Sequence, residues 1–335
     1  MVLNILSKLP EGFFETPVTG LHELLGGPTL IHLKTENPAK PLYLSTLLHG
    51  NETSSHSVLL RFLKNNTPLK RDLIIFIGNT LGASKGMRHL PGQVDYNRIW
   101  EEGNLPEHGL AKQVIEYAQA NEPFASIDLH NNTGKNPFYG CINKLDEEFK
   151  NLASHFGEHT VYFTEPHNVQ SMAFSKICPS VTVEAGLPGE EAGIEQALKF
   201  VETIYHFETI EHHPTRQKNL VYHTLARFKV HHDAKVDFED SPFTGSDLSF
   251  DSNLDSRNFE VVKKGTRIGF AKNLDHLIVE NNRGEIITDQ FIKIEDNKII
   301  MTRTFIPSMF TKDIYVMKED CLGYLMEVMI ALKQQ

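Results

Sequence analysis

Cysteine is scarce in this chain, whose 335 residues include only Cys141, Cys178 and Cys321. The three lie far apart, so they show neither the paired spacing of a thiolate zinc site nor the density of a disulfide framework. This scarcity indicates a reducing compartment.

Long hydrophobic runs are lacking as well. Residues 1–14 mix Lys8, Pro10 and Glu11 with apolar neighbours, which does not fit the continuous apolar segment of a secretory signal. No other stretch is long and apolar enough to span a bilayer. We therefore expect a cytoplasmic protein.

Positive charge is in deficit. Lys and Arg number 33 against 43 Asp and Glu, a net charge of -10. This balance disfavours nucleic acid or an anionic membrane as the main partner, without excluding a local basic pocket. Hydrophobic residues make up 40% of the chain and charged residues 23%, which argues against a disordered or fibrous polymer.

Short apolar runs alternate with helix-like stretches over the first two thirds of the chain. This alternation predicts an α/β sheet covered on both faces, in which ligands gather at the carboxyl ends of strands. The expected strands are Leu42–Leu48, Leu73–Gly78, Phe124–Leu129 and Ser180–Glu184, and the expected helices are Ser54–Lys64, Leu110–Ala120, Glu147–Phe156 and Glu190–His206.

A second, β-rich domain is expected after a linker at His212–Arg216, so we divide the chain into residues 1–215 and 216–335. Phe238–Ser256 is predicted to be a loop, and Cys321–Leu332 fits either a strand or an amphipathic helix. The expected strands here are Leu220–Leu225, Arg227–Val230, Phe259–Val262, Leu277–Val279 and Ile299–Phe305.

The first expected strand runs into His49-Gly50-Asn51-Glu52. Two intervening residues let the imidazole and the carboxylate converge on one ion, and we expect Gly50 to supply the freedom for a sharp bend. Alone, such a pair arises often by chance. A second histidine, His130, follows the third strand, and two histidines with one carboxylate are the ligand set of a catalytic zinc site whose fourth position is left for water.

A further carboxylate, Glu184, ends the fourth strand in a glycine turn. A buried carboxylate there is costly without a partner, and near a metal it can act as general base and then general acid. The alternative is an exposed loop glutamate.

Between these segments lie Arg88 and the run Asp95-Tyr96-Asn97-Arg98. An arginine fork can grip a carboxylate, a neighbouring amide can hold a second polar group, and a separate arginine can stabilise an oxyanion. The alternative is a solvated charged loop.

Taken together, these motifs resemble those of the succinylglutamate desuccinylase and aspartoacylase family, which is itself similar to the zinc carboxypeptidases. The resemblance runs from about Leu42 to Phe207, and the β-rich tail extends it more loosely. It rests on His49-Gly50-Asn51-Glu52, Asp95-x-Asn97-Arg98, Asp128-x-His130 and Glu184-Ala185-Gly186.

The resemblance implies a mixed sheet flanked by helices with a smaller β-rich C-terminal domain that caps the active site. It also implies a zinc-dependent amidohydrolase that cleaves the amide of a small N-acyl amino acid and holds one Zn²⁺ per chain. The implied roles are metal ligands for His49, Glu52 and His130, base for Glu184, carbonyl polarisation for Arg88, substrate binding for Asn97 and Arg98, and orientation of the ligand histidines for Asp95 and Asp128.

Two departures from the family pattern leave the substrate open. The interval between Arg88 and Asn97 is longer than usual, and Asn131–Pro137 differs from the typical desuccinylase. The alternatives are a metallocarboxypeptidase acting on a short or modified peptide and a carboxylate-binding protein without catalysis. A homo-oligomer is possible. The surface is the expected location of seven further histidines: His155, His159, His167, His212, His213, His231 and His232.

Overall fold

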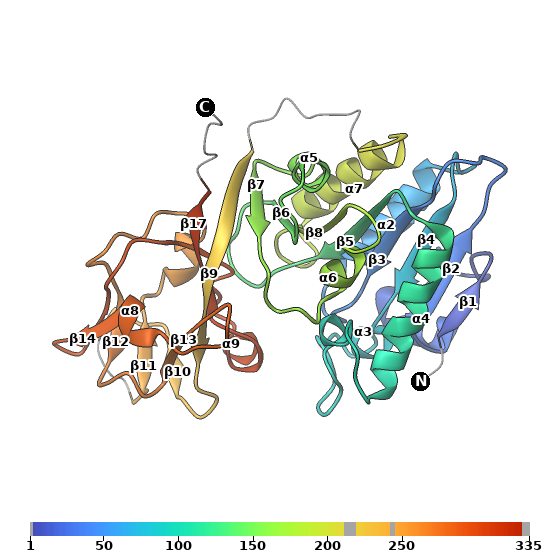
Figure 1. Ribbon diagram of the computed structural model, residues 1–335. Helices are drawn as coiled ribbons and strands as arrows, with labels where there is room; N and C mark the ends of the chain where they lie inside the picture. Colours follow the sequence, from blue (N-terminus) through green and yellow to red (C-terminus); the bar gives the residue numbers. More distant parts are fainter. Residues whose placement is uncertain (1–2, 211–218, 242–244, 330–335) are drawn as a thin grey trace, which may run out of the picture. The chain divides into compact units, whose positions relative to one another are not determined.

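The computed structural model describes residues 3–210, 219–241 and 245–329. The chain divides into two compact units (Figure 1): the first comprises residues 1–131 and 138–219, and the second comprises residues 132–137 and 220–335. The predicted linker at His212–Arg216 lies outside the described residues.

The first unit is built on a mixed sheet with the strand order β1-β2-β4-β3-β5-β8-β6-β7. The central strands β4, β3, β5 and β8 are parallel, whereas β2 runs antiparallel to β4 and β6 antiparallel to β8. The bounds are β1 Asn4–Leu6, β2 Thr29–Leu33, β3 Leu42–Thr46, β4 Leu73–Ile77, β5 Ala125–His130, β6 Tyr139–Ile142, β7 His159–Tyr162 and β8 Ser180–Glu184.

Side chains of the central strands alternate between two hydrophobic cores, because successive residues of a strand point to opposite faces. In β4, Ile75 belongs to the first core, while Ile74 and Phe76 belong to the second. The first core is shared with α1 Leu21–Leu25, α2 Ser54–Asn65, α5 Glu147–Ser154 and α7 Glu191–Tyr205. The second is shared with α4 Pro106–Asn121 and α6 Gln170–Phe174.

Helices therefore cover both faces of this sheet, which confirms the expected α/β class (Figure 1). The unit also contains the short helices η1 Val18–Gly20, α3 Thr80–Ala83 and η2 Tyr96–Arg98. No helix in the described ranges combines the length and the hydrophobicity that crossing a membrane requires.

The second unit is β-rich. Its strand β9 pairs antiparallel with β13 on one side and β17 on the other, and β17 pairs with β16. A separate sheet has the order β10-β11-β12-β15-β14. The bounds are β9 Leu220–Val230, β10 Val236–Asp237, β11 Leu248–Phe250, η3 Leu254–Arg257, β12 Arg267–Ala271, β13 Leu277–Asn281, α8 Thr288–Phe291, β14 Ile292–Glu295, β15 Lys298–Met301, β16 Ile306–Ser308, α9 Ile314–Glu319 and β17 Gly323–Val328.

Several predictions for the second unit are wrong in detail. The two runs expected on either side of Ala226 form the single strand β9, in which residues are alternately buried. Phe259–Val262 is not a strand, because Phe259 has a φ of 61° and only Val262 makes an isolated bridge, to Phe305.

Other boundaries also shift. The run expected to reach Phe305 ends as a strand at Met301, and the predicted loop Phe238–Ser256 contains β11 and part of η3. The segment from Cys321 forms the strand β17, so the described part of Cys321–Leu332 is not a helix. In each case pairing with a distant strand decides the conformation.

Candidate metal centre and active site

The candidate site lies where β3, β5 and β8 end. In β5, Ile127 and Leu129 face the first core, so Asp128 and His130 point to the opposite face of the sheet. Glu184 is the in-register partner of His130 on the neighbouring strand β8. Strand periodicity and register thus bring a histidine and a carboxylate from distant segments to one edge.

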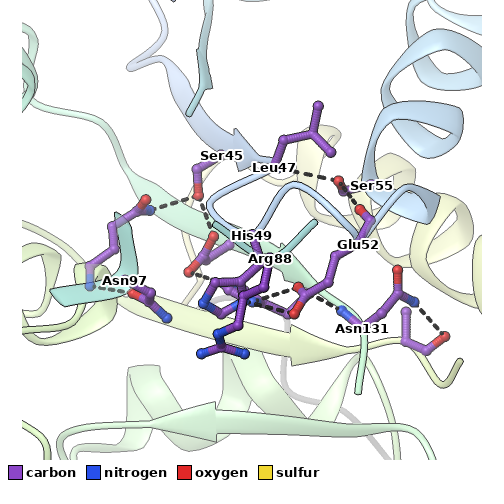
Figure 2. Close-up of polar contacts among 12 residues, drawn as sticks. Ser45, Leu47, His49, Glu52, Ser55, Arg88, Asn97 and Asn131 are labelled. Carbon is purple, nitrogen blue, oxygen red and sulfur yellow. Dashed lines mark hydrogen bonds and ion pairs between the residues drawn. The ribbon is translucent and has the colours of Figure 1, made fainter. Parts of the chain in front are cut away.

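The loop between β3 and α2 carries His49 and Glu52. Its first residue, Leu47, is buried with a φ of 56°, a conformation that costs a non-glycine residue about 1–3 kcal/mol. Ser55 compensates, because its hydroxyl accepts a hydrogen bond from the Leu47 N–H at 3.3 Å and donates to the Glu52 carbonyl at 2.9 Å (Figure 2). The start of α2 therefore fixes the turn that presents the two predicted ligands.

Gly50 has a different role from the one expected. It is not among the glycines with positive φ, so conformational freedom is not what the bend requires of it. A Cβ at Gly50 would overlap backbone atoms of Gly82, Ala83 and Met87. Glycine is needed here because another backbone segment passes directly against the loop.

The three predicted metal ligands converge. The Nδ1 atom of His49 lies 2.7 Å from Oε1 of Glu52, and the Nδ1 atom of His130 lies 2.8 Å from Oε2 of the same carboxylate (Figure 2). All three side chains are buried, and one ligand atom from each lies within 4.8 Å of the others. Two imidazoles and one carboxylate are a donor set that divalent zinc accepts.

Both histidines use their second ring nitrogen to contact a carboxylate. Nε2 of His49 lies 3.2 Å from Oδ1 of Asp95, and Nε2 of His130 lies 2.9 Å from Oδ2 of Asp128. A carboxylate partner fixes a proton on Nε2 and leaves the Nδ1 lone pair for a metal, as in other histidine-ligated sites. The donor set and its convergence therefore fit a divalent metal.

Electrostatics keeps the acidic members of this cluster ionised. Burial acts to raise the pKa of Glu52, but the imidazoles of His49 and His130 outweigh it and hold that pKa well below its usual range. Burial likewise opposes ionisation of Asp95, whose pKa is nevertheless held well below its usual range by Arg88, His49 and Arg98.

Glu184 is in the opposite situation. Its side chain is buried, and its Oε2 has no hydrogen-bond partner among the described residues. Burial, reinforced by the charges of Glu52 and Asp128, raises the pKa of Glu184 to about 8. An ionisable group with such a shift beside a candidate metal centre has the properties of a proton-transfer group.

The run from Asp95 to Arg98 organises the other side of the site. The Arg88 guanidinium donates through Nε and Nη2 to Oδ2 of Asp95, at 3.1 and 2.9 Å, while Oδ1 of Asp95 accepts the Asn97 N–H at 2.7 Å. Asp95 therefore connects a predicted ligand, His49, to the predicted carbonyl-polarising arginine. The Arg98 guanidinium donates to the Asn97 carbonyl.

Three further buried residues complete the polar network, of which the sequence analysis noted only Asn131, as the start of the departure Asn131–Pro137. Ser45 donates to Asp128 at 2.6 Å, Gln170 donates to Ser45 at 2.7 Å, and the Asn131 N–H donates to Glu52 at 3.0 Å. Polar Ser45 within the apolar strand β3 was a usable signal. No local pattern marks Gln170, which is the first residue of the short helix α6.

The other histidines form no comparable buried site in the described residues. His231 and His232 lie near Asp233 and could share an ion, but His232 and Asp233 are exposed and His231 is only half-buried. His212 and His213 lie outside the described residues. A separate cavity of about 840 Å³, lined by Trp100, Lys112, Asn143 and Lys176 among others, includes none of the predicted site residues. The candidate site is therefore identified by its possible metal ligands and not by this cavity.

Comparison with known proteins places the fold. No protein-family model matches the chain, and no curated protein matches it in sequence. A succinylglutamate desuccinylase from Vibrio parahaemolyticus is similar in structure, with a TM-score of 0.60 and 15% identity, over 90% of this chain and 86% of that one. A succinylglutamate desuccinylase/aspartoacylase from Rhodobacter sphaeroides has a TM-score of 0.59 and 12% identity, over 89% and 88%.

Murine aminoacylase 3 is similar as well, with a TM-score of 0.56 and 14% identity, over 88% of this chain and 97% of that one. At these identities the likeness establishes the fold. The resemblance drawn from the sequence motifs is thereby confirmed at the level of architecture, including the smaller β-rich part.

Proposed function

We propose that this protein is a zinc-dependent amidohydrolase that cleaves the amide bond of a small N-acyl amino acid. The observation that carries the proposal is the buried convergence of His49, Glu52 and His130, each imidazole backed by a carboxylate, beside the buried carboxylate of Glu184. The substrate class follows from the structural neighbours, which are named as desuccinylases and an aminoacylase.

In this proposal His49 and His130 bind one Zn²⁺ through Nδ1, and Glu52 binds it through its carboxylate. When bound, the metal polarises a substrate carbonyl and lowers the pKa of water to about 7. The two outer carboxylates, Asp95 and Asp128, hold the histidines in the tautomer that exposes Nδ1.

Glu184 moves the proton. As a carboxylate it takes a proton from the attacking water, whose oxygen bonds to the carbonyl carbon. It then gives that proton to the amide nitrogen as the carbon–nitrogen bond breaks, which releases a carboxylic acid and a free amine. The acid then loses its remaining proton to solvent. The Oε2 atom of Glu184 supports this role, because it is buried beside the proposed ligands and has no hydrogen-bond partner among the described residues.

The two arginines and Asn97 orient the substrate. Arg88, held by Asp95, stabilises the negative charge that develops on the carbonyl oxygen. Arg98 and Asn97 bind the carboxylate of the amino-acid part. The Oδ1 atom of Asn97 already accepts the Gln170 N–H at 3.0 Å, so the amide turns its Nδ2 donors toward a different partner, the correct polarity for a carboxylate.

The test is a substrate panel with the zinc-loaded chain. N-succinyl and N-acetyl amino acids are compared with peptides that have a free C-terminus, and released amine is measured. Cleavage of the short N-acyl amino acids supports the proposal. Cleavage of peptides alone identifies a carboxypeptidase, and binding of carboxylates without any cleavage identifies a binding protein.

Glu184→Gln is the matched control, because the amide retains the shape of the side chain but cannot take up the proton. The variant should keep its zinc and lose turnover by about 10²–10⁴-fold. A variant that retains most of its activity contradicts the assigned role of Glu184.

Three further features belong to the proposal. The resemblance also implies that long peptides are excluded, so activity should fall as the substrate is lengthened. A cytoplasmic location is supported by the scarcity of cysteine, since the chain has only three, all buried. A homo-oligomer remains compatible with the proposal, and sedimentation measurements would settle the assembly.

A further inference from the structure

Gln170 occupies an unusual position for a glutamine. It is fully buried, at 0% exposure, and it is the first residue of the short helix α6. Its side chain and its backbone donate hydrogen bonds to two different parts of the candidate site. The side chain contacts Ser45, and the backbone N–H contacts Asn97.

The side-chain contact begins a chain of hydrogen bonds that ends at the metal ligands. Nε2 of Gln170 donates to Ser45 Oγ at 2.7 Å, Ser45 Oγ donates to Asp128 Oδ1 at 2.6 Å, and Asp128 Oδ2 lies 2.9 Å from Nε2 of His130. The exposures of Ser45, Asp128 and His130 are only 0%, 1% and 4%.

The donors and acceptors in this series of hydrogen bonds can be arranged in only one way. The Asp128 carboxylate can only accept, so the single hydroxyl proton of Ser45 points to Asp128. Ser45 must then accept from the next partner, and only the amide NH₂ of Gln170 can donate there. Glutamine is therefore chemically specified, because a carboxylate or an apolar side chain at position 170 would leave the buried Ser45 acceptor without a donor.

The backbone contact reaches the substrate side. The Gln170 N–H donates to Oδ1 of Asn97 at 3.0 Å, which fixes how the Asn97 amide is turned. The Asn97 N–H is meanwhile held by Asp95. The first residue of α6 thus contacts the proposed carboxylate-binding amide and, through two intermediates, a proposed zinc ligand.

We propose that Gln170 is a positioning residue that sets the orientation of His130 through Ser45 and Asp128 and, independently, the orientation of Asn97 through its backbone N–H. This rests on the proposed function, since it assumes that His130 binds zinc and that Asn97 binds substrate. Hydrogen bonds in a low-dielectric interior couple the orientations of the groups they join, and losing one member leaves its neighbour unpaired there.

Two pairs of variants test the hydrogen bonds that lead from the Gln170 side chain to His130. Gln170→Met keeps the length and the backbone N–H but removes the donor, and Ser45→Ala removes the next link. Each has a neighbouring control that deletes a buried hydroxyl with no hydrogen-bond partner in the described residues: Ser171→Ala on α6 and Thr46→Val on β3. The primary measurement is zinc affinity by competition with a chelator, which needs no substrate.

Loss of an outer partner of a metal-ligating histidine weakens metal binding by about 10–100-fold. The direct partner of His130 is Asp128, and Ser45 is one step further out, so we expect Ser45→Ala to fall toward the lower end of this range. Gln170→Met should shift affinity in the same direction by a smaller factor, with both controls at the wild-type value. Equal affinity in wild type and in both Ser45→Ala and Gln170→Met overturns the inference. An equal loss in the control variants also overturns it, because the effect would then be general destabilisation.

Comparison of Gln170→Pro with Gln170→Met tests the hydrogen bond from the Gln170 backbone N–H to Asn97. Proline is well tolerated at the first position of a helix, and the preceding Val169 has the extended conformation that proline requires (φ −101°, ψ 157°). Both variants lack the side-chain donor, but only the proline variant lacks the N–H that holds Asn97. Gln170→Pro should therefore raise KM relative to Gln170→Met, whose defect should lie in kcat and zinc affinity.

The same data separate this inference from the proposed function. A wild-type chain that binds zinc and cleaves N-acyl amino acids, with all Gln170 variants unchanged, refutes the positioning role alone. An unchanged KM in Gln170→Pro relative to Gln170→Met refutes the claim that the Gln170 N–H orients Asn97. A wild-type chain that neither binds zinc nor cleaves the panel refutes the proposed function, and the positioning role falls with it. If Gln170→Met does not fold, Ser45→Ala tests whether this series of hydrogen bonds orients His130.

Discussion

Nδ1 of His130 lies 2.8 Å from Oε2 of Glu52, although one residue ends a strand and the other lies in a loop before a distant helix. The other oxygen of this carboxylate contacts Nδ1 of His49 at 2.7 Å. A single buried anion thus holds together the two nitrogen atoms that zinc would share. This geometry is compatible with binding a cation with little rearrangement of the side chains.

Zinc should stabilise the folded chain through this cluster. A ligand present at 100 times its dissociation constant adds about 2.7 kcal/mol to the free energy of unfolding, so the melting temperature should rise when zinc is added to the chelated protein. His130→Ala should abolish that rise. His232→Ala, which alters the exposed histidine pair, serves as the control and should retain it. A zinc-dependent rise that survives in His130→Ala but is lost in His232→Ala would place the metal elsewhere.

Asp95 should matter for both metal and turnover. It accepts from His49 and from Arg88, so Asp95→Asn should disturb one zinc ligand and release the arginine. We expect about a 10–100-fold loss in zinc affinity or kcat/KM. Glu280→Gln, which removes the charge from an ion pair with Arg227 and Lys229 in the second unit, is the control. Equal effects of the two substitutions would argue against a specific role for Asp95.

Gly50→Ala should destabilise the chain. The added methyl group would meet backbone atoms of three residues, and overpacking of this kind costs about 1–3 kcal/mol. Gly109→Ala is the matched control, because its Cβ would meet nothing within 4 Å on helix α4, where alanine is favoured by about 1 kcal/mol. Denaturant unfolding should therefore shift in opposite directions for the two variants. A neutral Gly50→Ala would show that the loop can move away.

Stability should fall on mild acidification, in part because of His56. This side chain is 3% exposed, packs edge-to-face on Phe13, and has a pKa lowered by burial. The folded chain therefore keeps His56 neutral at a pH where the unfolded chain takes up a proton, so unfolding gains a proton and stability falls as pH drops through about 6.5 toward the lower folded pKa.

His56→Leu should flatten this dependence between about pH 7 and pH 5, because leucine cannot take up a proton. The measurement is the free energy of unfolding in urea across that range, with the metal-free chain throughout. His232→Leu, at an exposed position, should leave the slope unchanged. An identical slope in wild type and His56→Leu would assign the acid sensitivity to other groups, such as the buried His32, whose pKa is also lowered by burial.

Much of the architecture and the proposed ligand set follow from sequence pattern. The four central strands are buried on both faces, so each reads as a short continuous apolar run with recognisable ends. Because β3, β5 and β8 are parallel, their carboxyl ends share an edge, and the polar residues that follow them converge. His49, Glu52, His130 and Glu184 could be identified for this reason.

Strand pairing determines features of the fold that the local sequence pattern does not predict. Outer strands such as β6 and β7 are only four residues long, too short for periodicity to mark them, and the break expected near Ala226 disappears because β9 is held by partners on both sides. The reason for Gly50 also became visible only once the segment from Gly82 to Met87 was found against it.

The sequence by itself determined the sheet, its helices and the identity of the proposed ligands, because residue spacing encodes which face of a strand or helix is buried. Only the tertiary structure decided that Asp95 connects His49 to Arg88, and that Gln170 reaches Asp128 through Ser45. Those contacts depend on strand register and on where a distant helix begins, and no local run of residues specifies either one.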